Sequence, residues 1–207
     1  MAIQNFRDLN EVHFDVLREI GNIGAGNAAT SLAQMMDTQI DMTTPTVKVL
    51  AINDAVNALG GPENVVIGIL VKLSGDIEGV MMFILRQEFA KDILVSLLGT
   101  DGAGCDHLSD MELSAISELG NIMIAAYASS ICALSQLSIK ISVPSVAVDM
   151  VGAILSTTLI EMSSVSDTTI FIEDDFIGSG SQIRANMMLL PTMESLNKLM
   201  QSLGIDL

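Results

Sequence analysis

The sequence is poor in aromatic and basic residues. Among 207 residues there are no Trp, one Tyr and six Phe, so the interior has to be built from Ile, Leu, Val, Ala and 14 Met. Only nine Lys and Arg accompany 25 Asp and Glu, which gives a formal net charge of −16. This charge would repel phosphate backbones and anionic lipid headgroups, which argues against nucleic acid and membrane surfaces as partners.

Cysteine and histidine are scarce as well. The two cysteines, Cys105 and Cys132, show no metal-ligand spacing with His13 or His107. We therefore expect reduced thiols and no metal site in this chain. Both histidines lie in polar surroundings and are expected at the surface.

The chain also lacks an apolar signal core in its first ten residues, which favours a cytoplasmic protein. A stretch of 21 uncharged residues between Glu118 and Lys140 is long enough to span a membrane. Its six Asn, Gln and Ser residues favour instead a buried helix that runs into a strand.

The sequence does contain a helical pattern that occurs twice. Residues 11–36 predict an amphipathic helix on which Asp15, Glu19 and Asn22 lie within roughly 60° of one another, opposite a mostly apolar face. The pattern returns 99 positions later in residues 109–137, and its polar face carries three matching positions: Ser114, Glu118 and Asn121. In each copy 22 residues separate the Asn from a proline, which is Pro45 or Pro144. One structural unit is therefore used twice.

The remaining elements repeat in the same order. Each long helix is followed by a Pro-containing edge strand, a short helix, a hairpin and a closing helix. The expected ranges are 38–52, 53–59, 64–73, 79–85 and 87–98, and then 138–148, 150–162, 168–174, 183–190 and 191–203. The second hairpin is expected to have a longer connection of Asp, Gly and Ser, and 100–107 to be a flexible joint.

This order predicts an α+β fold with an internal pseudo-twofold. Residues 1–207 would form a single domain made of two repeats, at about 11–99 and 109–204. The two long helices are expected side by side on a mostly antiparallel sheet. Gly21, Gly24 and Gly120 fall on the buried helix faces, where they would permit another backbone to approach. The alternative, that residues 21–26 (GNIGAG) cradle a phosphate, is weak because the glycines do not follow a strand and have the wrong spacing.

The Glu and Asn side chains point to a narrow range of chemistry. A solvated helix face would explain either triplet alone, but the same Glu–Asn separation in both copies makes that less persuasive. A carboxamide can hold and aim a water without titrating, and a nearby carboxylate can bind a cation. Together they suit a hydrolysis in which another component carries the electrophile and its metal, as when a GTPase glutamine orients an in-line water.

With these residues in view, the sequence resembles the CheC family of bacterial chemotaxis phosphatases, which is related to CheX and to the middle domains of the flagellar switch proteins FliY and FliM. The family motif consists of Asp or Ser, three residues, Glu, two residues, Asn, 22 residues and Pro. Both copies in this chain match it without a gap, and the resemblance covers the whole chain.

The resemblance implies a protein phosphatase that hydrolyses the phosphoaspartate of the response regulator CheY. Asn22 and Asn121 would then position the attacking water, and Glu19 and Glu118 would anchor a lysine of the receiver. Four further residues would support the site: Asp15, Ser114, Pro45 and Pro144. Mg²⁺ would belong to the receiver rather than to this chain. Because an acidic chain must dock near an acidic pocket, Met and aliphatic contacts are expected to contribute much of the affinity.

The resemblance also implies binding of the receptor deamidase CheD, for which Asp149 and the helix beginning near Met150 are the candidates. Asp149 could instead simply be the N-cap of that helix. A different class of function stays open, namely a non-catalytic adaptor that binds CheY or CheD, or a FliM/FliY-like flagellar switch module. The second complete motif disfavours CheX, and the absence of a recognisable further switch domain is taken to disfavour FliY.

Overall fold

The computed structural model describes residues 6–99, 108–161, 168–178 and 181–205. The α-helices are α1 (Glu11–Met36), α2 (Ile52–Ala58), α3 (Gln87–Leu98), α4 (Asp110–Ser135), α5 (Val151–Glu161) and α6 (Met193–Ser202), and a short 3₁₀ helix (Phe6–Asp8) precedes α1. The strands are β1 (Asp41–Met42), β2 (Thr46–Ala51), β3 (Val65–Gly75), β4 (Gly79–Arg86), β5 (Ile139–Ile141), β6 (Ser145–Met150), β7 (Thr168–Gly178) and β8 (Ser181–Pro191). The expected joint at 100–107, with Cys105 and His107, lies outside the described residues.

All of these strands belong to one antiparallel sheet. Its centre has the order β7-β8-β4-β3, with β1 and β2 paired to the outer side of β7 and β5 and β6 to the outer side of β3. Pro45 precedes β2 and Pro144 precedes β6, so each expected edge strand is divided into two short strands. A proline has no N–H to donate to a strand ladder, which explains the interruption.

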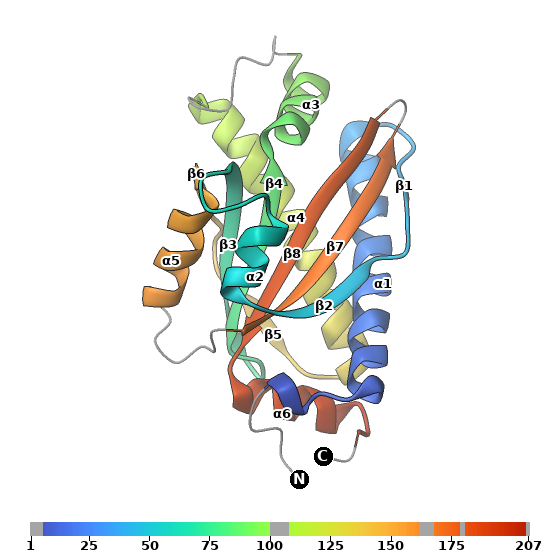
Figure 1. The fold of residues 1–207 in the computed structure, drawn as a ribbon. Helices are drawn as coiled ribbons and strands as arrows, with labels where there is room; N and C mark the ends of the chain where they lie inside the picture. The colour runs from blue at the N-terminus through green and yellow to red at the C-terminus, as the bar shows by residue number, and fades with distance from the viewer. Residues whose placement is uncertain (1–5, 100–107, 162–167, 179–180, 206–207) are drawn as a thin grey trace.

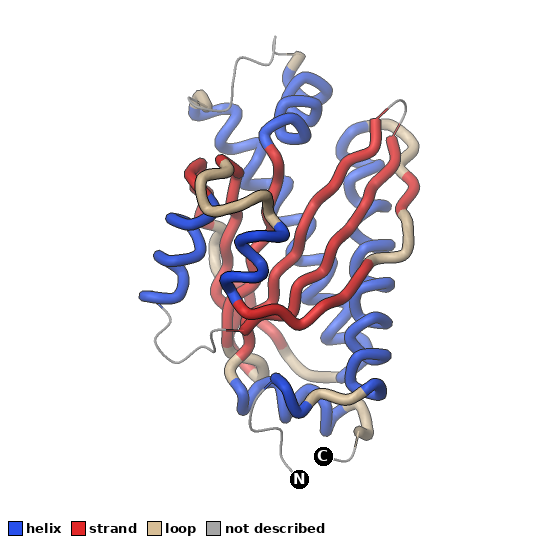
Figure 2. Tube along the Cα trace, viewed as in Figure 1, coloured by secondary structure: helices blue, strands red, loops and turns tan. Residues whose placement is uncertain are grey.

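The edge strands are exchanged between the two halves of the chain. β2 of the first half pairs with β7 of the second, and β6 of the second half pairs with β3 of the first (Figure 2). The registers are equivalent: Val47 lies opposite Ile172, and Val146, 99 positions after Val47, lies opposite Ile69. The halves therefore interlock in one sheet, in the α+β arrangement that the sequence predicts.

Helices cover both faces of this sheet (Figure 1). The long helices α1 and α4 run antiparallel on one face, with α3 and α6 at its two ends, and α2 and α5 lie on the other face. Side chains of β4 alternate between the two cores: Met81, Phe83 and Leu85 face the long helices, and Val80, Met82 and Ile84 face α2 and α5. Burial on both faces explains why the central strands are continuous apolar runs.

Glycines permit the close packing of the long helices. A Cβ on Gly120 of α4 would lie 2.4 Å from Cγ2 of Ile69, and one on Gly24 of α1 would lie 2.5 Å from Cδ1 of Tyr127. Real Cβ atoms do not come so near other heavy atoms, so any larger residue would force these elements apart. The predicted burial of these glycines is confirmed, but the atoms that approach them belong to side chains and not to another backbone. The alternative of a phosphate-binding loop is wrong because residues 21–26 lie inside α1.

The second hairpin differs from the prediction. Its strands continue to Gly178 and resume at Ser181, so the long connection expected after residue 174 does not exist. The acidic residue placed in that connection, Asp175, is instead paired within the ladder. Asp175 accepts a 2.8 Å hydrogen bond from Nε of Arg184 on the neighbouring strand.

The predicted surface position of His13 is also wrong, because this residue is only 4% exposed. Its Nδ1 accepts a 3.0 Å hydrogen bond from the N–H of Asn10, whose side chain caps α1 in return. α4 begins with the same reciprocal arrangement, in which Glu112 takes the place of His13 and Ser109 that of Asn10. Such capping boxes satisfy backbone N–H groups that a helix start leaves free.

α4 is long and apolar enough to cross a membrane by length and composition. More than half of its most apolar window, 56%, is buried inside the structure. Core helices of globular proteins meet the same criteria, and the burial of α4 against α1 and the sheet fits that explanation.

One polar pair is buried beneath the long helices. The hydroxyl of Tyr127 on α4 donates a 2.5 Å hydrogen bond to Oδ2 of Asp174 on β7, and both residues are at most 1% exposed. Burial raises the pKa of Asp174 from its ordinary 3.8 to about 7, although the hydrogen bond from Tyr127 works in the opposite direction. The pKa of Tyr127 is raised as well, chiefly by burial and then by the charge of Asp174.

The raised pKa of Asp174 predicts a pH-dependent stability. Because the folded state keeps this proton up to about pH 7 while the unfolded chain releases it near 3.8, the free energy of unfolding should fall as pH rises between these values. Replacing Asp174 by Asn should remove this fall, which amounts to roughly 4 kcal/mol at most. Urea unfolding of both proteins across pH 4 to about 8 measures the difference. A difference between them that stays constant with pH would contradict the prediction.

Candidate functional site

The first motif lies on the outer face of α1. Asp15, Glu19 and Asn22 are all exposed, while the inward positions Leu17 and Ile20 are buried in the core. Within the described part of the chain, the Asn22 amide makes no hydrogen bond with another group. The helix therefore presents a carboxylate and a free amide to any molecule that docks on this face.

The second motif occupies the same place on α4. Ser114, Glu118 and Asn121 are the fifth, ninth and twelfth residues of this helix, as their counterparts are of α1. Ser114 and Glu118 are exposed and Asn121 is half-buried. The structure thus brings each predicted triplet together on one helix face, and the two faces belong to different, antiparallel helices.

The motif prolines lie behind these faces. Pro45 is buried, and its Cγ would be 3.7 Å from a Cβ on Gly21, the residue that precedes Asn22. Pro144 is half-buried in the connection between β5 and β6. These positions suit a role in shaping the edge strands and, for Pro45, in supporting the helix.

The two faces carry different charged side chains. On α1, Arg18 lies 2.7 Å from Asp15 and 3.8 Å from Glu11, and all three side chains are exposed. α4 contains no Lys or Arg, and the uncharged Ser117 stands at the position equivalent to Arg18. The sequence analysis overlooked Arg18, although its three-residue spacing from Asp15 on a helix is a recognisable signal. Because the counterpart of Asp15 is the uncharged Ser114, Asp15, Arg18 and Glu19 carry together the same net charge of −1 as Ser114, Ser117 and Glu118. The two faces therefore differ in the arrangement of their charges.

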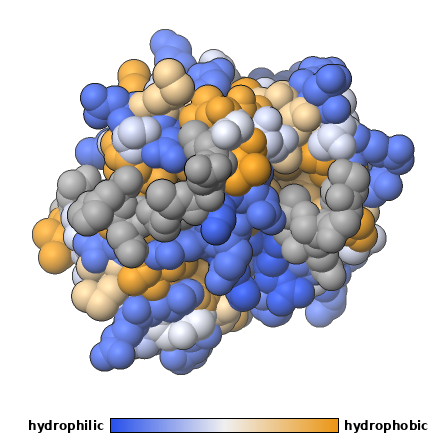
Figure 3. Space-filling model, turned by 90° about the horizontal axis from the view of Figure 1, so that it is seen from above, coloured by the Kyte–Doolittle hydropathy of each residue, from blue (hydrophilic) through white to orange (hydrophobic). Residues whose placement is uncertain are grey.

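Apolar side chains are also exposed on both motif helices. Val12 of α1 is 56% exposed and Met111 of α4 is 68% exposed. Figure 3 looks down on the end of the molecule where α3 lies and α4 begins, and it shows apolar patches among polar side chains. The end of the molecule at which α4 begins is therefore mixed in character.

A groove of about 470 Å³ runs between α1 and α4. It is lined by small and polar side chains of both helices: Asn27, Thr30, Ser31, Gln34, Ile122, Ala125, Ala126 and Ser129. Asn121 precedes the first lining residue of α4. The groove therefore lies beside the second motif, on the outer side of the helix pair.

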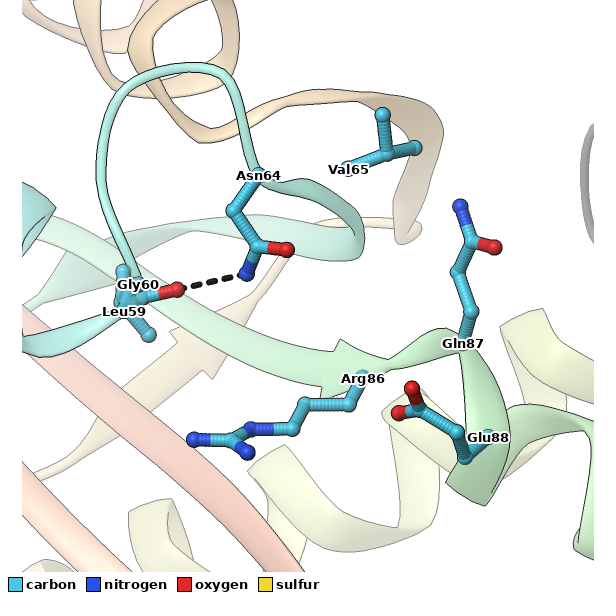
Figure 4. Close-up of a pocket in the computed structure, with 7 residues that line it drawn as sticks. All are labelled: Leu59, Gly60, Asn64, Val65, Arg86, Gln87 and Glu88. Atoms are coloured by element: carbon cyan, nitrogen blue, oxygen red, sulfur yellow. Dashed lines mark hydrogen bonds between the residues drawn. The ribbon is translucent and has the colours of Figure 1, made fainter.

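Two other cavities are separate from the motif residues. One of about 530 Å³ lies where α2 meets β3 and β4 meets α3. In Figure 4 the guanidinium of Arg86 extends away from Glu88, and Asn64 donates a 2.6 Å hydrogen bond to the carbonyl of Leu59. The other, of about 440 Å³, lies between α5 and the strands β3 and β6 and includes Asp149.

Of the two residues predicted to contact a second partner, Asp149 lines this last cavity and Met150 follows it in the chain. Asp149 is exposed at the end of β6 and Met150 is 44% exposed. Because α5 begins at Val151, Met150 rather than Asp149 occupies the N-cap position. Asp149 accepts a 2.7 Å hydrogen bond from the N–H of Met150, so the N-cap interpretation is off by one residue.

The site offers amides and carboxylates but little else. Among the described residues no group of three or more His, Cys, Asp or Glu could hold a metal ion. An amide that cannot titrate and an exposed carboxylate can orient a water and bind a cation. They can promote a hydrolysis when the electrophile comes with the docking partner.

Comparisons with known proteins agree with this geometry. The model of the CheC-like family matches residues 12–49 and 111–148, two segments that are 99 positions apart and contain both motifs, which suggests an internal duplication. The CheY-P phosphatase CheC of Bacillus subtilis is 35% identical over 98% of this chain and 99% of its own length.

Solved structures share the fold at lower identity. FliY of Thermotoga maritima superimposes with a TM-score of 0.77 at 21% identity, covering 95% of this chain and 98% of the other. The FliM middle domain of H. pylori does so with a TM-score of 0.65 at 12% identity, covering 94% and 99%. By its full-length likeness to CheC and its two matches to the family model, the chain belongs to the CheC-like family.

Proposed function

We propose that this chain is a phosphatase that removes the phosphoryl group from the phosphoaspartate of CheY. The observation that carries the proposal is the 35% identity, over nearly the whole of both chains, to a relative named CheY-P phosphatase. The exposed Glu19, Asn22 and Glu118 and the half-buried Asn121 support it, because a receiver can reach them. The action would take place in the cytoplasm.

In this mechanism the Asn amide enters the receiver pocket and orients a water in line with the bond from phosphorus to the aspartyl oxygen. The water oxygen bonds to phosphorus, the bond to the aspartate breaks, and the products are inorganic phosphate and a free carboxylate. The water's protons remain with the phosphate and its surroundings. Because phosphoryl transfer needs little covalent assistance, positioning a water supplies much of the acceleration. Mg²⁺ comes with the receiver.

The other motif residues hold the receiver and the helix in place. Glu19 and Glu118 pair with a lysine of CheY, Asp15 and Ser114 support the site one turn earlier, and the prolines shape the edge strands. The chain acts as one domain of two repeats, about 11–99 and 109–204, with one docking face on each.

Removal of the amides should abolish catalysis. With Asn22→Ala and Asn121→Ala combined, stimulated phosphate release should fall by about 100-fold or more, because the positioned hydrogen bonds act chiefly in the transition state. Single variants should each retain the activity of the other face. Phosphate release from purified CheY with Mg²⁺ measures this, and Asn27→Ala on the same helix is the matched control. A double variant as active as the parent would refute the water-positioning role.

The fold shared with the FliM middle domain raises a second candidate, a non-catalytic adaptor or switch module that binds CheY. The same assay separates the two. A phosphatase accelerates the loss of phosphate from CheY, whereas an adaptor binds phosphorylated CheY and leaves its own rate of hydrolysis unchanged.

The anchoring role of the carboxylates predicts an effect on affinity. Replacing Glu19 and Glu118 by Gln should raise KM for phosphorylated CheY by roughly tenfold at low salt and leave kcat nearly unchanged, since a pairing present before and during the reaction contributes uniform binding. The effect should shrink as salt rises. Glu194→Gln, an exposed acid on α6, serves as control. A fall in kcat with unchanged KM would be incompatible with anchoring.

We also propose that CheD binds around Asp149 and Met150, beside the cavity under α5. The exposed carboxylate and thioether next to a partly apolar cavity support this choice. Asp149→Lys should weaken CheD binding by roughly tenfold in calorimetry, as expected for reversal of an interfacial charge. Phosphate release without CheD should not change. Asp92→Lys on α3 is the control, and equal CheD affinity of both variants would exclude this surface.

A further inference from the structure

Val12 and Met111 occupy equivalent positions in the two copies, 99 residues apart. Each is the second residue of its helix and lies three residues before the first motif residue. At 100° per residue, Val12 and the three motif residues of α1 fall within roughly 80° of one another, and the same holds for Met111 on α4. Each motif face therefore begins with an exposed apolar side chain.

This exposure is specific to these positions on the motif helices. α1 and α4 are described over their whole lengths, and Val12 and Met111 are the exposed large apolar side chains within them. Single exposed apolar residues are ordinary at a protein surface. Here, however, equivalent positions in the two copies both carry an apolar side chain, although the residue itself differs. Each follows an acidic residue, Glu11 or Asp110.

The helix caps fix the backbone from which both side chains extend. Oδ1 of Asn10 accepts hydrogen bonds from the N–H groups of Val12 at 3.0 Å and His13 at 3.2 Å. On α4 the cap is formed by Ser109 and Glu112, with a 2.8 Å hydrogen bond from the N–H of Ser109 to Oε2 of Glu112. Because the first turn of each helix is fixed, an apolar contact made there costs little ordering.

The distance from the amides suits a docked protein. Asn22 lies ten positions after Val12 and Asn121 ten positions after Met111, which corresponds to about 15 Å along a helix. A typical protein interface covers about 800 Å² on each partner, equivalent to a circle of about 16 Å radius. A receiver centred on either Asn would therefore cover the apolar residue at the edge of its footprint.

We propose that Val12 and Met111 are apolar contacts for the CheY receiver, one on each face, and that they set its affinity rather than the rate of hydrolysis. The inference rests on the proposed function. The charge around Val12 and Met111 indicates the matching surface of the receiver. That surface would be an apolar patch bordered by basic side chains. The basic side chains would meet Glu11 and Asp15 on the first face and Asp110 and Glu118 on the second. Apolar contact supplies affinity where the negative charge of the chain opposes approach to an acidic pocket.

The test uses proteins in which one face works at a time. Val12→Thr is combined with Asn121→Ala, and Met111→Gln with Asn22→Ala, so that the Asn replacement inactivates the other face. Thr and Gln are chosen because they keep the shapes of Val and Met and add polarity. In each background KM for phosphorylated CheY should rise roughly tenfold with kcat unchanged, as expected for the loss of one apolar contact. Val12→Met should keep the low KM.

Ile160→Thr is the matched control, since Ile160 is 79% exposed on α5, away from both motif helices. An unchanged KM for Val12→Thr and Met111→Gln, or a fall in kcat alone, would overturn the inference while the proposed function stands. Sedimentation of the parent chain adds a second arm, because self-association abolished by the two replacements would assign these residues to a contact between copies instead. If the single-face backgrounds and the double Asn variant all keep full activity, it is the proposed function that fails.

Discussion

The structure depends on the close packing of each motif helix against strands of the other half. Gly120 of α4 lies against Ile69 of β3. Gly21 of α1 lies beside Val47 of β2 and Ile172 of β7, where a Cβ would be 3.2 Å and 3.7 Å from their Cγ2 atoms. Edge strands are exchanged in the same sense, since β2 pairs with β7 and β6 with β3. Neither half can therefore position its own helix without the other.

This packing also sets the direction of the chemistry. Gly21 and Asn22 are neighbours about 100° apart on a helix, as are Gly120 and Asn121. Because the core holds the glycine face of each helix against the sheet, the amide of the following Asn points away from the sheet. The result is an amide on a helix that is held by the core, exposed at Asn22 and half-buried at Asn121. Such a group gains a function only when a partner supplies the pocket, so docking and chemistry are inseparable in this design.

The two halves are alike in backbone and unlike in detail. In the second half, Tyr127 and Asp174 form a buried hydrogen bond. In the first half, Ala28 of α1 stands at the position of Tyr127 and Val71 of β3 at the position of Asp174, and both are fully buried and apolar. Arg18 on the first face has Ser117 as its counterpart on the second. Differences in packing and charge of this kind allow two faces with the same motif to differ in affinity for a receiver.

The sequence by itself determined the long helices, the apolar strands and the polar triplets, because each depends on a local period of about 3.6 or 2 residues. It also indicated that Gly21, Gly24 and Gly120 face inward. Local pattern carries no information on partners far along the chain. The exchange of β2 and β6, the burial of His13 in a helix cap and the extension of β7 beyond Asp174 to Gly178 were therefore decided by the tertiary structure. His13 is buried with its Nδ1 bonded to the N–H of Asn10, and Asp174 is buried with its Oδ2 bonded to the hydroxyl of Tyr127. Among the described residues, Nε2 of His13 and Oδ1 of Asp174 have no hydrogen-bond partner.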